Sequence, residues 1–169
     1  MTPEPSHNIQ VIFSNEQQNV RIPAKLYLFL RRACQDIWAQ EQFTGSARIC
    51  IRLIDDQIMQ RLNLAHRGID AATDMLILPT GKNGVYDQDL DTGALILGDI
   101  VLSLPRALHQ AKLDGHSPQQ RLAALTVHAM LHLLGYNHET GGPESVRLRE
   151  KEAGILSQLE RPLSLKHHA

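Results

Sequence analysis

One long helix that is apolar on most of its sides is the feature that most constrains the fold of this chain. The segment SPQQRLAALTVHAMLHLLG begins at Ser117. Ser117 is suited to be the N-cap, Pro118 takes the first helical position, and Gln120 follows the cap by three residues, which is the capping-box pattern. Gly135 supplies the stop. The pattern predicts a largely buried helix over residues 118–134.

Strands and helices alternate along the rest of the chain. Apolar, β-branched runs predict strands over residues 9–13, 48–54, 74–78 and 94–103. Helical spacing of apolar residues predicts helices over residues 23–40, 55–67, 105–113 and 143–159. Residues 79–93, rich in glycine and aspartate, predict a loop on the surface or near an active site. Because some connections are too short for parallel crossovers, we expect an α+β fold: a small mixed β-sheet of about four strands covered by helices.

Length and composition limit the organisation further. A chain of 169 residues with 43% hydrophobic residues predicts a single domain over residues 1–169, with residues 163–169 frayed. The chain contains no run of about 18 apolar residues and no signal-peptide pattern at its start, so we expect no membrane span and a cytoplasmic location. The formal net charge of -1 gives no overall attraction to nucleic acid, so any RNA would need a local basic surface.

Three histidines near the end of the long helix predict a metal site. His128 and His132 are four residues apart, and His138 follows six residues later. With 9 histidines in the chain, chance gives about half of one such pair, so the pair alone is weak evidence. The third histidine lowers the chance expectation to roughly a few per cent.

The spacing of these histidines suits zinc. His128 and His132 share one helix face, with Cβ atoms about 5–6 Å apart, and the reversal at Gly135 lets His138 return toward the same ion. Three neutral nitrogens without a fourth protein ligand describe an open tetrahedral site for one Zn²⁺ per chain. The alternative is a set of core histidines bonded to backbone carbonyls. Ala129 occupies the position where a zinc peptidase needs its glutamate base, which disfavours that class.

The same residues resemble a known family. HAMLHLLGYNH is similar to the signature H-G-x-L-H-L-x-G-Y-D-H of the YbeY family, single-domain zinc-dependent endoribonucleases also called ribosomal RNA maturation factors. Three further segments resemble the family: LNLAHRGIDAATDMLILP, LGDIVLS and EKEAGIL. The first of these supplies the matching residues Asn63, Arg67, Thr73, Asp74, Leu76 and Pro79.

The resemblance implies a function and roles for particular residues. It implies a single-strand-specific endoribonuclease that acts in 16S rRNA 3′-end maturation and in ribosome quality control. Zinc would be held by His128, His132 and His138, with His128 and Arg67 in catalytic roles. Single-stranded or ribosomal RNA, the small ribosomal subunit and its associated proteins would be the partners. A guanidinium beside the ion would stabilise the negative charge that develops on the phosphate. We interpret Thr73 and Asp74 as structural support.

Four positions depart from the family pattern. Ala129 replaces a glycine, a small-for-small change that leaves the helix intact. Asn137 replaces an aspartate, so a carboxylate that could orient a ligand is lost there, and orientation must come from an amide or from elsewhere. Ile77 and Leu78 replace serine and phenylalanine.

Two other classes of function fit the same residues. One is a non-catalytic RNA-binding ribosome-assembly factor with a structural zinc, and the other is a zinc hydrolase acting on a small molecule or a peptide. A nuclease with this net charge should gather basic residues near the metal, and the candidates are Arg48, Arg52, Arg67 and Arg106. An acidic rim around His128 would argue against RNA.

Overall fold

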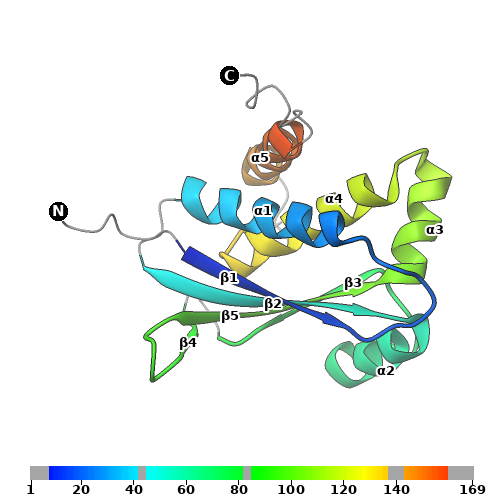
Figure 1. Ribbon diagram of the computed structural model, residues 1–169, viewed down its shortest axis with the longest axis horizontal. Helices are drawn as coiled ribbons and strands as arrows, with labels where there is room; N and C mark the ends of the chain where they lie inside the picture. The colour runs from blue at the N-terminus through cyan, green and yellow to red at the C-terminus, as the bar shows by residue number, and fades with distance from the viewer. Residues whose placement is uncertain (1–7, 42–44, 82–84, 137–142, 160–169) are drawn as a thin grey trace.

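The helices and strands follow one another in the order that the sequence predicts. The computed structural model describes residues 8–41, 45–81, 85–136 and 143–159. Its elements are β1 (Asn8–Asn15), α1 (Ala24–Gln40), β2 (Ser46–Ile54), α2 (Asp56–Arg67), β3 (Met75–Pro79), β4 (Asp87–Gln88), β5 (Leu95–Ser103), α3 (Leu104–Asp114), α4 (Pro118–Leu133) and α5 (Pro143–Leu159) (Figure 1). Each predicted helix and strand is present, and the expected fraying of residues 163–169 lies outside the described residues.

The sheet is mixed, as predicted, but it has five strands rather than about four. The strand order is β1-β2-β5-β3, and β4 also pairs with β5. β1, β2 and β5 run parallel, whereas β3 and β4 run antiparallel to β5. The missed strand is β4, two residues inside the segment predicted as a loop. Its strand conformation comes from pairing with β5, which a local pattern of turn residues does not reveal.

The two faces of the sheet have different neighbours. Along β2 the side chains of Ile49 and Ile51 enter the main core together with residues of α1 and α4, while the residues between them face the opposite side. On that opposite side Met59 of α2 packs against Leu76 and Val101 at one end of the sheet. Figure 1 shows α1 and α4 on one side of the sheet and α2 on the other.

Helix α4 lies at the centre of this arrangement. The capping box is present as predicted: Gln120 N donates to Ser117 Oγ at 3.0 Å, and Ser117 N donates to Gln120 Oε1 at 2.8 Å. Apolar side chains line most of the helix, and its fully buried members include Leu122, Val127 and Met130. Burying each such side chain contributes about 1.5–3 kcal/mol. The position of α4 is therefore determined by packing.

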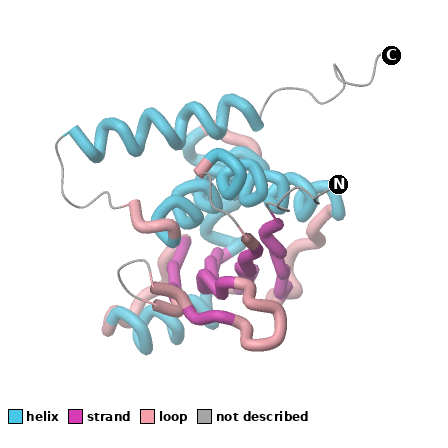
Figure 2. Tube along the Cα trace, turned by 90° about the vertical axis from the view of Figure 1, so that its left-hand side faces the viewer, coloured by secondary structure: helices cyan, strands magenta, loops and turns pink. Residues whose placement is uncertain are grey.

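Helix α5 forms an outer layer against α4. Leu148, Ile155 and Leu159 of α5 are buried in the main core. Figure 2 shows the strands below the helical layer and α5, next to the C-terminus, on the far side of that layer from the sheet. In the described part of the chain no helix has the length and hydropathy needed to cross a membrane.

Strand β5 has an irregularity where β3 approaches it. The register between β2 and β5 shifts at Ile49, which pairs with Gly98. Gly98 has φ of 143°, and a Cβ atom added there would lie 2.3 Å from the carbonyl oxygen of Leu78 in β3. Both the backbone conformation and the close approach therefore require glycine.

We expect Gly98→Ala to lower the free energy of unfolding by about 2–4 kcal/mol, because it adds backbone strain and a clash with the β3 backbone. Urea unfolding of the full chain measures this change. Gly154→Ala is the matched control, because no neighbouring atom lies within 4 Å of its added Cβ. Since alanine favours a helix more than glycine does, this substitution should raise the free energy of unfolding by about 0.5–1 kcal/mol. Similar effects from the two substitutions would contradict the close approach of β3 and β5.

Candidate metal centre

His128 and His132 lie on the one accessible face of α4. The side chain of His128 is 35% exposed and His132 is exposed, whereas Ala129, Met130 and Leu131 between them are buried. The sequence correctly predicts that the helix is buried, but the two imidazoles themselves are not. An accessible pair of imidazoles one turn apart suits an open metal site, which must admit a substrate.

A carboxylate from α5 contacts the first of these histidines. His128 Nδ1 lies 3.2 Å from Glu152 Oε1, and the side chain of Glu152 is 19% exposed. An ionised carboxylate only accepts hydrogen bonds, so this contact is a hydrogen bond when the ring proton is on Nδ1. Sequence reasoning missed Glu152, since the two residues are separated by 24 positions. The carboxylate beside His128 thus comes from α5.

The turn after α4 is anchored to two other helices. Gly135, with φ of 105°, ends the helix as predicted. Tyr136 then donates from its hydroxyl to Glu41 Oε2 at 2.6 Å, and Lys151 Nζ donates to the same hydroxyl at 3.0 Å. Lys151 also forms an ion pair with Glu41. Burial lowers the pKa of Lys151, but hydrogen bonds to Glu41 and Tyr136 outweigh it and raise that pKa. These contacts hold Tyr136, two residues after the helix cap, against the end of α1 and against α5.

The predicted loop over residues 79–93 also contacts the end of α4. The Tyr86 hydroxyl donates to the backbone oxygen of Leu133 at 2.5 Å. Burial raises the pKa of Tyr86. Because Leu133 directly follows His132, this hydrogen bond ties the β3–β4 edge of the sheet to the candidate site, as the loop prediction allowed.

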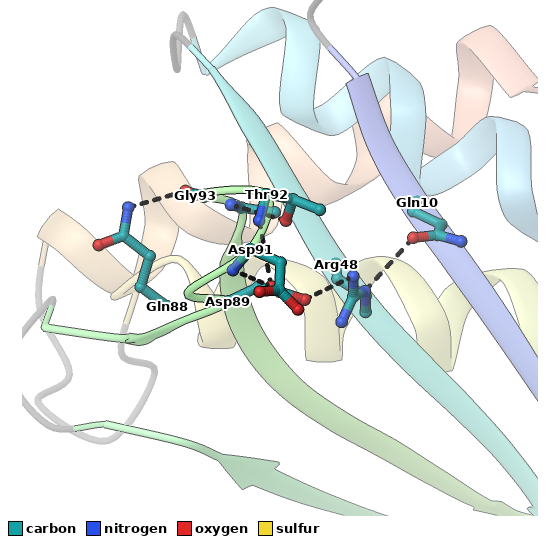
Figure 3. A network of polar contacts seen from close by, with 8 residues as sticks. Gln10, Arg48, Gln88, Asp89, Asp91, Thr92 and Gly93 are labelled. Carbon is teal, nitrogen blue, oxygen red and sulfur yellow. Dashed lines mark hydrogen bonds and ion pairs between the residues drawn. The ribbon is translucent and has the colours of Figure 1, made fainter.

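Two of the arginines expected near the metal lie elsewhere. Arg48 Nη2 lies 3.1 Å from Asp89 Oδ2, and Arg48 Nε donates to Gln10 (Figure 3). Arg52 Nε lies 2.7 Å from Glu16 Oε2, and this hydrogen bond lowers the pKa of Glu16. Both arginines alternate along β2 with the side chains that face α4. The prediction that they gather around the metal is therefore wrong.

Arg67 differs from these two arginines in its exposure and its contacts. It is the last residue of α2, is exposed, and precedes Gly68, which has φ of 71°. Its guanidinium forms no ion pair in the part of the chain that the structure describes, whereas Arg106 Nε lies 3.3 Å from Asp56 Oδ1. α2 packs on the face of the sheet opposite α4, and no contact in the described ranges joins Arg67 to His128 or His132. The catalytic role of Arg67 therefore stays an untested prediction.

Asp74 has the structural role expected of it. Arg121 Nη2 donates to Asp74 Oδ2 at 2.6 Å, which joins the start of β3 to α4. Ser103 N donates to the backbone oxygen of Asp74, which also ties this turn to the end of β5.

Comparison with known proteins identifies the family. A family model described as endoribonuclease YbeY matches residues 12–160. The chain belongs to the YbeY family. Endoribonuclease YbeY of Chloroflexus aggregans is 40% identical over 133 residues, which are 79% of this chain and 87% of the relative. Endoribonuclease YbeY of Desulforamulus reducens is 36% identical over 149 residues, which are 88% and 96%.

A solved structure shares the fold. The solution structure of a Thermotoga maritima protein matches with a TM-score of 0.61 and 22% sequence identity, and the match covers 90% of this chain and 89% of that chain. At this identity the likeness shows that the two proteins have the same fold.

Two departures from the YbeY pattern are packing residues. Ile77 pairs with Ile100 and packs against the main core, and Leu78 packs against the smaller cluster beneath α2. Both side chains are half-buried. Their apolar character follows from these contacts.

The third predicted ligand lies outside the described residues. This ligand is His138, and Asn137, which departs from the family pattern, also lies outside the described residues. Within the described ranges no three metal-binding side chains are grouped together. The ligand set His128, His132 and His138 therefore remains a prediction, and two of its members share the accessible face of α4.

We expect Tyr86→Phe to lower the free energy of unfolding by about 1 kcal/mol at neutral pH, because the hydrogen bond to Leu133 is lost. The pKa of Tyr86 is raised by burial, so its stabilisation is fully present below about pH 10 and decreases as pH rises through the folded pKa. Urea unfolding of both proteins at neutral pH and above about pH 10 measures the difference, which should narrow at high pH.

The matched control is Tyr27→Phe, since the Tyr27 ring packs edge-on against Phe13. In the described part of the chain the Tyr27 hydroxyl has no hydrogen bond, so Tyr27→Phe should lower the free energy of unfolding by less than Tyr86→Phe does. A stability difference for Tyr86→Phe that stays constant above about pH 10 would contradict the buried hydroxyl.

Proposed function

We propose that this protein is a zinc-dependent, single-strand-specific endoribonuclease that acts in 16S rRNA 3′-end maturation and in ribosome quality control. The observation that supports it best is the pair of accessible imidazoles on α4, one of them in contact with a carboxylate, in a chain of the YbeY family. Single-stranded or ribosomal RNA is the proposed substrate, and the small ribosomal subunit with its proteins is the proposed partner. The proposed location is the cytoplasm.

The described histidines fit one Zn²⁺ ion per chain. Neutral imidazoles are ordinary zinc ligands, and the His128–Glu152 contact matches the carboxylate that often accompanies such a ligand. His128 and His132 would hold the ion together with His138. Zinc bound there would polarise a phosphate oxygen and activate water.

Arg67 is proposed to act on the phosphate. Its guanidinium is always charged and can form two parallel hydrogen bonds to phosphate oxygens. Among Arg48, Arg52, Arg67 and Arg106, Arg67 alone forms no ion pair with a carboxylate in the described ranges. Its charge is thus available to a negatively charged substrate.

Protein purified without added metal should contain one zinc per chain, and chelation should abolish cleavage of a single-stranded RNA until zinc is restored. His128→Ala and His132→Ala should each lose zinc and cleavage while staying folded. Metal analysis and a cleavage assay measure this. His109→Ala, an exposed histidine of α3, is the matched control and should behave as wild type.

The cleavage assay, together with a measurement of RNA binding at several salt concentrations, separates the other classes of function. RNA binding without cleavage would indicate an assembly factor with a structural zinc. Binding that does not weaken as salt rises would argue against a polyanionic substrate. Cleavage that persists in a well-purified variant lacking both histidines would overturn the proposed mechanism.

We expect Arg67→Ala to lower kcat by about 10²–10³-fold, the usual effect of losing a donor to transition-state charge, with zinc content unchanged. Arg67→Lys should recover little of this rate, because an ammonium does not form the paired hydrogen bonds. Arg61→Ala removes an exposed arginine of the same helix and should leave kcat near wild type. Equal rates for the Arg67 and Arg61 variants would exclude a catalytic role for Arg67.

A further inference from the structure

The buried stripe of α5 contains a carboxylate. Leu148, Ile155 and Leu159 are 3%, 3% and 4% exposed. Glu152 follows Leu148 by four residues and precedes Ile155 by three, so it lies on the same side of the helix. Glutamate is uncommon on an inward-facing stripe unless its charge is paired. The position of Glu152 therefore requires a polar partner, and the contact with His128 provides one.

This contact determines which nitrogen of His128 is available to a metal. An ionised carboxylate favours the tautomer with its proton on Nδ1, the nitrogen that lies 3.2 Å from Glu152 Oε1, and the two nitrogens lie on different sides of the imidazole ring. With Nδ1 directed at α5, Nε2 is directed elsewhere. Among histidines that bind metals, such a partner on the second nitrogen fixes the tautomer and the ring orientation.

The neighbouring residue holds α5 in place. Lys151 pairs with Glu41 at the end of α1 and donates to Tyr136 in the turn after α4. Its ammonium also lies 5.0 Å from the centre of the Tyr136 ring. Polar contacts on Lys151 and apolar contacts on Leu148 thus position the turn of α5 that carries Glu152. A group held this firmly is suited to orient another side chain.

We propose that Glu152 is a positioning residue of the metal centre, which holds the His128 ring through Nδ1 so that Nε2 binds zinc. This inference rests on the proposed function, because it requires zinc at His128. Loss of such a partner ordinarily weakens metal affinity by about 10–100-fold.

The first test is zinc affinity, measured by competition with a chromophoric chelator on the full chain. Glu152→Ala should raise the Kd for zinc by about 10–100-fold. Glu152→Gln keeps an oxygen that can accept from Nδ1–H and should lose less affinity, so it also serves if the alanine variant does not fold. Glu150→Ala removes an equal charge from the exposed side of α5 and should match wild type.

The second test reports on His128 directly. In ¹H–¹⁵N spectra of the zinc-free chain, the ring proton should be on Nδ1 in wild type and Glu152→Gln, and should shift toward Nε2 in Glu152→Ala. A proton on Nε2 in wild type would overturn the inference. The visible spectrum of the cobalt-loaded protein should be the same in wild type and Glu152→Gln; a changed spectrum would indicate that Glu152 is itself a ligand and would also overturn it.

These outcomes distinguish the inference from the proposed function. If the wild-type chain binds no zinc, the proposed metal centre fails. If wild type binds zinc but Glu152→Ala and Glu150→Ala have equal Kd values, the positioning role fails while the zinc centre stands.

Discussion

The burial of α4 is the constraint on which the rest of the structure depends. The helix lies between the sheet and α5, and its buried side chains include Leu122, Val127 and Met130. Each contributes about 1.5–3 kcal/mol, while a partly exposed charged contact contributes about 1 kcal/mol or less. The positions of His128 and His132 are therefore set by hydrophobic packing rather than by their own polar contacts. A site built on such an element needs little reorganisation to bind an ion.

Local patterns account for what the sequence predicted well. The bounds of α4 follow from Ser117, Gln120 and Gly135, residues that act through neighbours a few positions away. Apolar periodicity located the other helices and the longer strands for the same reason. Strand β4 and the irregularity at Gly98 depend instead on partner strands, so the local sequence pattern does not predict them.

In the candidate site, too, features set by local spacing were predicted, whereas features set by packing between distant elements were not. Spacing placed His128 and His132 on one face, since four residues make one helical turn. Glu152 could have been suspected as an acidic residue on the apolar stripe of α5, but its partner depends on how α4 and α5 pack. Arg48 and Arg52 were misplaced for a related reason. Alternation shows that they oppose Ile49 and Ile51, yet it does not show which face α4 covers.

The place of α5 along the chain has a consequence for the order of folding. Its carboxylate contact joins His128 to a residue 24 positions later, close to the end of the described chain. During synthesis the residues of the sheet and of α4 are made before Glu152, because the chain grows from its N-terminus. Among the described helices, the one made last is thus the one that supplies the carboxylate beside His128. A nascent or C-terminally shortened chain would present the histidines without their carboxylate.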